Sequence, residues 1–429
     1  MVEIILIGSF LFFLVVGVPI AFVLGLVGVL HLLLSGEFHS FLPLIMRKMI
    51  QGADNFILVA VPMFMLAGNL MNASGITSRL VKFADAMVGW LRGGLGHVNV
   101  VVSMIFAGIT GIATADTSAM CTVMVPAMEK AGYDRDFATG VTSTSSLIGA
   151  IIPPSVQMVL FSVIAGVSTG KLFSAGFLPG VLLGLSMMAL VSYYSIKRKY
   201  PISSRFSLKR LGLSFITSFL ALSMPVVMIG GLLIGVFSPT EASAVGVAMA
   251  MFIGFFVYRE LKLKDLPGIL WRSGRLTAAV MVLVSTAAIF SFTLTYEDVP
   301  VKVADFLLSL TTNKYIFLIY INILLLFIGT FMDITASTII LTPILVPIAM
   351  QYGVDPVHFG LIMVLNLVIG CITPPVGIVI FVASTITGLS YERVVKAVIP
   401  FLIASLVVLL ITTYWEGGIM YLPNLLFPD

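Results

Sequence analysis

Long apolar stretches, separated by short polar ones, follow one another along almost the whole chain. They lie at 4–34, 55–72, 98–128, 137–165, 173–196, 212–236, 239–257, 276–295, 315–350, 357–386 and 397–415. A helix needs about 20 apolar residues to cross the hydrocarbon core of a bilayer. The pattern therefore predicts about ten to twelve membrane segments, including segments that enter and return without crossing. The sequence is expected to fold as an all-α integral membrane protein.

Composition agrees with this prediction, since 59% of the 429 residues are hydrophobic and only 10% are charged. The formal net charge of +4 is spread over loops and does not indicate nucleic-acid binding. The two cysteines and four histidines lack the spacing of a disulfide framework or a metal cluster. The apolar N-terminus, 1–34, has no basic region before it and no small-residue cleavage site. We expect it to be a retained helix rather than a signal peptide.

The chain repeats itself with an offset of 221 residues. The matching positions carry Gly, Pro, Thr and Asp rather than the Leu and Val that apolar chains share by chance. They include Gly108 and Gly329, Thr114 and Thr335, Pro126 and Pro347, Asp134 and Asp355, Gly149 and Gly370, and the pairs Pro153-Pro154 and Pro374-Pro375. The sequence thus predicts two homologous halves. We expect a scaffold helix and interfacial arm in 1–54, a first repeat in 55–200, a basic loop and connector helices in 201–258, and a second repeat, with its own interfacial arm, in 259–429.

Basic residues are placed unequally at the ends of the two repeats. Six Lys or Arg lie between Lys197 and Arg210, whereas no basic residue follows Lys396. By the positive-inside rule, the first end is expected in the cytoplasm and the C-terminus in the periplasm. Equivalent ends on opposite sides of a membrane are typical of inverted-topology repeats, which many secondary transporters contain.

Each repeat carries a proline pair inside an apolar stretch, in GAIIPPSVQMVLF from Gly149 and in GCITPPVGIVIFV from Gly370. A proline in a membrane helix removes a backbone hydrogen bond and bends the chain. Such a break is tolerated where it packs in protein or lines a polar cavity. We expect proline-broken helices at about 137–165 and 357–386. Freed carbonyls suit a small cation and half-helix N-termini suit a carboxylate, so a site is predicted between the repeats.

A second motif occurs in both repeats, GITGIATADTSA from Gly108 and GTFMDITASTII from Gly329. Small and hydroxyl residues interrupt an apolar run there, which predicts re-entrant hairpins at about 98–131 and 315–350. Asp116 and Asp333 lie at or near the tips. A charge at membrane depth is costly unless it is paired, hydrated or bound to a cation, so a functional role is our first hypothesis. The alternative is a helix cap, expected mainly of Asp116, which lies four positions nearer the returning half-helix in the repeat alignment.

The order of several short motifs resembles one transporter family. The motifs are GVPIAFVLG, VPMFMLAGNLMNASGI, AGYDRDFA, IIPPS, LFSAGFLPG, FSPTEASA and ITPPVG, and together they cover nearly the whole chain. On these residues the chain resembles the large membrane subunit of tripartite ATP-independent periplasmic (TRAP) transporters. The resemblance implies an inverted-repeat, elevator-type ion-transporter fold. It also implies sodium-coupled import of an organic acid, such as a C4-dicarboxylate or sialic acid, across the bacterial inner membrane.

The same resemblance implies two partners. One is a soluble periplasmic binding protein that delivers the substrate. The other is a small four-helix membrane subunit, which we expect as a separate chain because the sequence starts directly with MVEIILIG.

The resemblance further implies about two sodium ions per cycle, each held where a hairpin tip meets the proline-broken helix of its own repeat. The first site would use Thr110, Thr114, Asp116, Gly149 and Pro153. The second would use Gly329, Asp333, Thr335, Gly370, Thr373 and Pro374. Substrate would lie between the tips, on a path lined by Ser143, Ser145, Ser146, Ser155, Gln157, Ser337 and Asn366. Neither hairpin contains an arginine. Carboxylate recognition would therefore use hydroxyls, backbone amides, helix dipoles and sodium, unless Arg47, Lys48 or Arg135 folds inward.

The residues leave two other functions open. A proton-coupled antiporter or exporter of the same fold would carry protons on the aspartates. An intramembrane aspartyl protease would pair them in catalysis, but Asp116 follows Ala and Asp333 follows Met, without the Gly-x-Gly-Asp context of such enzymes. We therefore do not expect an enzyme. GVSTGK from Gly166 lacks the spacing of a phosphate-binding loop, so ATP is not implied.

Overall fold

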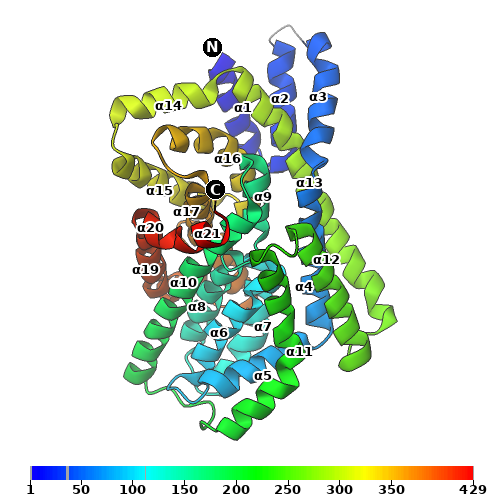
Figure 1. Ribbon diagram of the computed structural model, residues 1–429. Helices are drawn as coiled ribbons and strands as arrows, with labels where there is room; N and C mark the ends of the chain where they lie inside the picture. The colour runs from blue at the N-terminus through cyan, green and yellow to red at the C-terminus, as the bar shows by residue number, and fades with distance from the viewer. Residues whose placement is uncertain (1, 35–37, 112, 429) are drawn as a thin grey trace.

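The computed structural model describes the backbone of residues 2–34, 38–111 and 113–428, and the side chains of these ranges apart from 2–7, 15, 38–42 and 106–110. Within these ranges the fold is helical, and its one β-type pairing is an isolated bridge between Arg92 and Ile202 (Figure 1). Eight of the described helices are long and apolar enough to cross a membrane, and five shorter apolar helices accompany them. The prediction of an all-α membrane protein is confirmed.

The helices before and within the first repeat follow the predicted order, but several single stretches divide in two. The N-terminal stretch becomes α1 (Val2–Val15) and α2 (Ile20–Leu34), because Gly17 has a φ of 87° and Pro19 follows it. The next elements are α3 (Phe38–Ala53), η1 (Phe56–Val59), α4 (Ala60–Ala73), α5 (Ile76–Val88), α6 (Gly94–Thr110), α7 (Ala113–Lys130), α8 (Arg135–Ser145), η2 (Ser146–Ala150), α9 (Val156–Ala165) and α10 (Thr169–Lys197).

The rest of the chain repeats this order. It contains α11 (Leu208–Leu233), α12 (Pro239–Phe252), η3 (Ile253–Val257), η4 (Leu263–Asp265), α13 (Leu266–Tyr296), α14 (Val299–Leu310), α15 (Lys314–Phe331), α16 (Ile334–Gln351), α17 (Pro356–Gly370), α18 (Ile378–Thr387), α19 (Tyr391–Tyr414), α20 (Glu416–Ile419) and α21 (Tyr421–Leu426). At the offset of 221 residues, the helix pair α6–α7 matches α15–α16. The pair α8–α9 matches α17–α18 in the same way.

Two matching short helices show the relative orientation of the repeats. Helix α5 lies at the lower end of the molecule and α14 at the upper end (Figure 1). Because they occupy the same place in the two repeats, the repeats have opposite orientations, as inverted topology requires. Two amphipathic segments of the sequence, from Ser78 and from Arg259, are expected to lie along the membrane interface as arms. The first falls in α5, and the second covers η4 and the start of α13. The helix matching α5 is α14.

Helices α1–α5 and α11–α14 form a part of the molecule that we call the scaffold. Helix α2 packs against α13, and the connector helix α12 packs against α4. At the repeat offset α2 matches α12 and α4 matches α13, so the helix that precedes each repeat packs against a helix of the other repeat. Between α2 and the end of α13, Nε2 of His31 lies 3.0 Å from Oε1 of Glu297. The scaffold thus has the same approximate symmetry as the sequence.

Helices α6–α10 and α15–α19, which include both hairpins and both broken helices, form the remainder, which we call the transport core. Helix α7 packs against α18, and α16 packs against α9. Each returning hairpin half therefore contacts the broken helix of the other repeat. Every residue of α17 from Val357 to Gly370 is buried, which places the broken helices at the centre of the transport core.

Candidate functional site

The tip of the first hairpin is a glycine turn against the broken helix of the same repeat. Gly111 has a φ of +60° and separates the end of α6 from Ala113, the first residue of α7. A β-carbon on Gly111 would lie 3.0 Å from the backbone nitrogen of Val156 and 3.2 Å from the carbonyl oxygen of Pro154. The positive φ and the close approach both favour glycine. This tip and the segment after the first proline pair are in direct contact.

The first break is held by a serine cap. Helix α8 passes into the 3-10 turn Ser146–Ala150, a cis proline pair follows, and α9 begins at Val156. The hydroxyl of Ser155 donates to the carbonyl of Ala150 over 2.6 Å and accepts from the amide of Met158 over 3.4 Å. Ser155, predicted to line the substrate path, is buried and bonded to both sides of the break.

The tip of the second hairpin is capped by Asp333. Its Oδ1 accepts from the backbone amides of Thr335 over 2.9 Å and Ala336 over 3.4 Å, and the side chain is exposed. This is the N-cap geometry of helix α16. The capping role expected mainly of Asp116 is therefore observed at Asp333. Asp116 lies instead inside the first turn of α7, where it is buried.

Backbone contacts join the second tip to the broken helix of its own repeat. The amide of Gly377 donates to the carbonyl of Thr330 over 3.0 Å. Gly329 and Gly370 also meet, and a β-carbon on Gly370 would lie only 2.6 Å from the Cα of Gly329. Because both partners are main-chain atoms, no flexible side chain can give way. The second hairpin thus rests on its broken helix through two glycines.

The second break is held by hydroxyls from two elements. Thr373, after the end of α17, donates its side-chain proton to the carbonyl of Ile369 over 2.9 Å. The hydroxyl of Tyr391, at the start of α19, lies 2.8 Å from the carbonyl oxygens of both Pro375 and Val376. It has one proton and can donate to one of them at a time. Tyr391 could not be predicted from the sequence, because its contact with the proline segment depends on how α19 packs.

The hydroxyls near the tips differ in exposure. Thr117 donates to the carbonyl of Ala113 over 2.8 Å, and its oxygen lies 2.6 Å from the hydroxyl of Ser146. Thr114 and Thr335 are half-buried. The side chain of Thr110, another predicted sodium ligand, lies outside the described residues.

The predicted path residues of the first repeat do not face an open path. Buried among them are Ser143, Ser145, Ser146, Ser155 and Gln157. Ser143 donates to the carbonyl of Thr139 in its own helix over 2.6 Å. Ser103 of α6 donates to Ser145 over 3.0 Å. These hydroxyls bond within α8 or join it to the first hairpin, because α6 and α7 pack directly on α8.

The predicted path residues of the second repeat are also buried. The side-chain amide of Asn366 donates to Oδ1 of Asn322 over 2.5 Å, and Asn322 donates to Thr413 over 3.2 Å. The hydroxyl of Ser337 and the Oδ1 of Asn366 have no hydrogen-bond partner among the described residues. Buried oxygens without partners are uncommon and mark places that accommodate a water molecule or an ion.

A cavity of about 410 Å³ lies between the scaffold and the transport core. Scaffold helices α3 and α13 line one side, and α9 and α16 of the transport core line the other. Its polar lining consists of Lys48, Gln51, Asn55, Ser291 and Thr295. The ammonium of Lys48 lies 5.4 Å from the ring centre of Phe292, which also lines the cavity. A cation, two amides and two hydroxyls thus converge on one space.

Lys48 is one of the three cations predicted from the sequence as candidates for carboxylate recognition. Arg47 is exposed and does not line the cavity, and Arg135 lies 3.8 Å from Glu129 in another part of the molecule. The other polar lining residues were not predicted from the sequence. The four-residue spacing of Ser291 and Thr295 could have indicated two of them, because it places both hydroxyls on one face of α13.

Comparisons with known proteins agree with this architecture. The family model described as "Tripartite ATP-independent periplasmic transporter, DctM component" matches residues 7–417. The chain is 41% identical over 427 residues to the uncharacterized protein YgiK of Salmonella typhimurium, covering 99% of this chain and 98% of that one. It is 38% identical over 409 residues to the sialic acid TRAP transporter large permease protein SiaM of Vibrio cholerae, covering 95% of each.

A solved structure shows the same fold at low sequence identity. The crystal structure of the Alcanivorax borkumensis YdaH transporter, described as having an unusual topology, superposes with a TM-score of 0.63 at 16% identity and covers 89% of each chain. The family match encloses both hairpins and both broken helices. The chain belongs to the DctM, or large permease, family of tripartite ATP-independent periplasmic transporters.

Proposed function

We propose that the chain imports an organic acid across the bacterial inner membrane, coupled to sodium, as its transport core moves against the scaffold in an elevator mechanism. The supporting observation is that each hairpin tip contacts the proline-broken segment of its own repeat. Gly111 lies against Pro154, and the Thr330 carbonyl accepts from Gly377. These contacts gather backbone carbonyls, hydroxyls and a carboxylate at two matching places. Hard cations prefer such oxygen ligands.

The oxygen-rich segments fit two sodium ions. The first would be held by 110–116 together with 149–155, and the second by 329–335 together with 370–374. The hairpin segments 110–116 and 329–335 each contain one aspartate. The cap at Asp333 uses Oδ1 and leaves Oδ2 for a cation. When bound, sodium would supply a positive charge that neutralises the aspartate and attracts a substrate carboxylate.

The cavity beside Lys48 suits an organic acid. Its single ammonium can pair with a carboxylate, while the amides and hydroxyls around it can bond to the rest of a small polar substrate. Relatives are named as transporters of sialic acid, C4-dicarboxylates, 2,3-diketo-L-gulonate and isethionate. All four are organic anions, and this shared chemistry is the basis for proposing that class as the substrate.

The place of the cavity supports the elevator mechanism. It lies between the two parts of the molecule rather than inside one, so movement of α9 and α16 past α3 and α13 would change access to it. Such transport would also need partners. We propose a small membrane subunit against the scaffold and a periplasmic binding protein that supplies substrate, consistent with the word tripartite in the family description.

Uptake into proteoliposomes tests this proposal. The chain is reconstituted with its small subunit, and the cognate binding protein carries radiolabelled substrate. We expect uptake only with external sodium, a membrane potential that is negative inside, and the binding protein. Equal uptake in potassium buffer at fixed pH would refute sodium coupling, and uptake that follows pH without sodium would favour a proton-coupled transporter.

The substrate assignment has a separate test. Lys48→Gln removes the ammonium in the cavity and should raise the KM for substrate at least tenfold, since a charge-assisted bond contributes about 1.5–3 kcal/mol. Arg47→Gln is the matched control, because Arg47 is the exposed neighbour of Lys48 and does not line the cavity. An unchanged KM in Lys48→Gln would contradict carboxylate binding in this cavity.

A further inference from the structure

Another cavity, of about 190 Å³, lies where the end of α10, the start of α8 and the start of α19 meet. Its charged lining residues are Asp136, Arg198, Arg393 and Lys396, and aromatic rings of Phe137, Tyr194 and Phe401 complete the wall. The lining thus contains three cations and one carboxylate.

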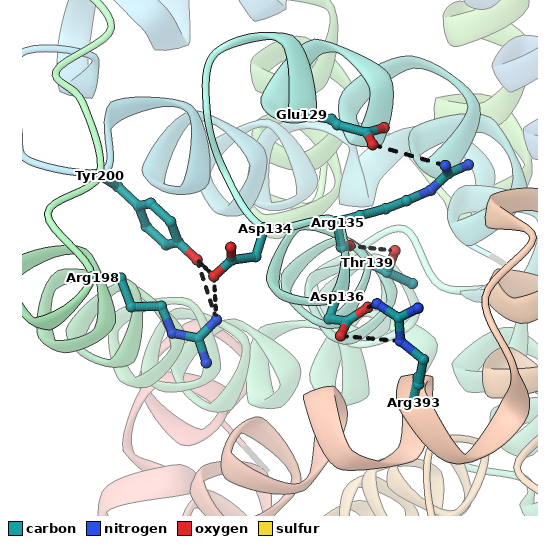
Figure 2. Close-up of polar contacts among 8 residues, drawn as sticks. All are labelled: Glu129, Asp134, Arg135, Asp136, Thr139, Arg198, Tyr200 and Arg393. Carbon is teal, nitrogen blue, oxygen red and sulfur yellow. Dashed lines mark hydrogen bonds and ion pairs between the residues drawn. The ribbon is translucent and has the colours of Figure 1, made fainter.

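Two of the cations are held in fixed positions by neighbouring carboxylates. Figure 2 shows Arg198 bonded to Asp134 and Arg393 bonded to Asp136. The Arg198 contact is 2.7 Å long, and the Arg393 guanidinium makes two contacts with Asp136, of 2.8 and 3.3 Å. The Arg198 guanidinium also lies 5.3 Å from the ring centre of Tyr194. These contacts fix the guanidinium groups before any ligand binds, which lowers the ordering cost of binding.

The third cation is not neutralised in this way. Lys396 is exposed, and no carboxylate within the described part of the chain lies in ion-pair range of its ammonium. It stands one turn from Arg393 on α19, so the two project from the same side of that helix. With Asp136 occupied by Arg393, the cavity keeps a surplus of positive charge.

The surroundings of this cavity are those of a membrane surface. Both α10 and α19 are long, apolar candidate membrane spans. Apolar side chains next to the cavity are exposed on both helices, at Ile196 of α10 and at Ile399 and Ile403 of α19. The basic segment from Lys197 to Arg210 follows directly, so the positive-inside rule predicts that this end faces the cytoplasm. The cytoplasmic leaflet is the one that carries negative surface charge.

We propose that this cavity binds the phosphate of an anionic phospholipid head group, with the acyl chains along the apolar surface of α10 and α19. The guanidinium groups and Lys396 supply donors for phosphate oxygens. Basic pockets between membrane helices on the cytoplasmic side commonly bind such head groups. The exposed apolar residues beside the cavity favour a lipid over a free phosphate ion.

Native mass spectrometry of the purified full chain tests the proposal. The chain in detergent is titrated with phosphatidylglycerol, and with phosphatidylcholine for comparison. We expect tighter binding of phosphatidylglycerol and about a fivefold loss in Lys396→Gln, the effect of one basic residue near a charged membrane surface. Lys209→Gln is the matched control, an exposed lysine of the adjacent basic segment that does not line the cavity. Equal binding of the two lipids, or an equal effect of both variants, would overturn the proposal.

A second variant should act in the opposite direction. Asp136→Asn removes the one carboxylate that lines the cavity and should tighten phosphatidylglycerol binding, whereas a cavity with only a structural role would show no such gain. Should loss of the Asp136–Arg393 contact unfold this variant in a thermal melt, Lys396→Gln decides the question. In a third arm, inorganic phosphate is added as competitor. Displacement of the lipid by phosphate at equal concentration would show a free-anion site and refute the lipid assignment.

Discussion

The two hairpins occupy matching places in the fold but carry their carboxylates differently. Asp333 is exposed and caps α16, whereas Asp116 is buried inside the first turn of α7. At the repeat offset Asp116 aligns with Ser337, so each tip has acquired an acidic residue at its own position. What the repeats share is the backbone, namely a tip in contact with a proline-broken helix. The main-chain geometry of the tips, rather than the position of the aspartates, is therefore what the two repeats have in common.

A side-chain bond joins each hairpin to the first half of its own broken helix. Asn99 donates to Thr142 of α8 in the first repeat, and Asn366 of α17 donates to Asn322 in the second, each over 2.5 Å. In the second repeat the backbone of Gly329 also contacts Gly370. One difference follows from a single position, because Ser146, the first residue of η2, aligns with Leu367 of α17. Thr117 therefore has a hydroxyl partner that its counterpart Thr338 lacks, and the hydroxyl of Thr338 is buried without a partner among the described residues.

The largest effect is expected from breaking the glycine contact. Gly370→Ala places a methyl group 2.6 Å from the Cα of Gly329, so the hairpin must move away from α17. Overpacking of this kind typically costs about 1–3 kcal/mol or more, and we expect uptake to fall below a tenth of the wild-type rate. Gly274→Ala is the control, because nothing lies near its β-position on α13. Wild-type uptake by Gly370→Ala would show that the tip need not touch the broken helix.

The next largest effect is expected at the aspartates. Asp333→Asn keeps a capping oxygen but removes the charge, so expression should be unchanged while the sodium concentration for half-maximal uptake rises at least tenfold. Asp116→Asn should raise this concentration less, because Asp116 lies inside the first turn of α7 rather than at the tip. Uptake against sodium concentration is measured for both. Unchanged sodium dependence in Asp333→Asn would restrict the site to the backbone of the hairpins.

A smaller effect, on stability, is expected from removing the hydroxyls of Thr117 and Thr338. Thr117→Val removes a partner of Ser146 and should lower stability by about 1–3 kcal/mol. Thr338→Val removes a buried hydroxyl without a partner and should be neutral or stabilising. The two substitutions are chemically the same, so each controls for the other in thermal unfolding in detergent. Equal losses would mean that Thr338 has a partner, such as a bound water or ion.

The smallest effect concerns the aspartates that begin α8 and α17. Asp355 caps its helix, accepting from Val357 over 2.8 Å, whereas the matching Asp134 makes no cap bond and accepts instead from Tyr200 over 2.6 Å and Arg198 over 2.7 Å. The Tyr200 hydroxyl, together with Arg198, lowers the pKa of Asp134 below its ordinary value. A carboxyl with a lowered folded pKa stabilises the protein above its unfolded pKa of about 4, and this contribution disappears as pH falls through the lower folded value.

Tyr200→Phe should therefore raise the pKa of Asp134 and lower the thermal stability slightly at neutral pH. Since both proteins carry a protonated Asp134 in strong acid, their stabilities should converge below about pH 4. Melting curves across pH measure this. Tyr193→Phe serves as the control on the exposed surface of α10. A difference that stays constant with pH would mean that Tyr200 does not act through Asp134.

The repeats, the hairpins and the proline breaks were predictable because Gly and Pro determine backbone geometry locally. The partners of individual side chains were not. The serines of α8 looked like a polar path in sequence, but α6 and α7 cover them. Which aspartate would cap its helix depended on where each helix begins, and both helices start within a few residues of the tip. Lys48 could be predicted as a candidate for carboxylate recognition. The cavity beside it could not be predicted, because it forms only where the scaffold and the transport core meet.

The measurement that tests the two-site account most directly is the initial rate of uptake against sodium concentration, at constant membrane potential and ionic strength. Two cooperating cation sites, one at each hairpin, predict no uptake without sodium and a sigmoidal curve with a Hill coefficient approaching about 2. A rate that is unchanged when potassium replaces sodium would contradict the account.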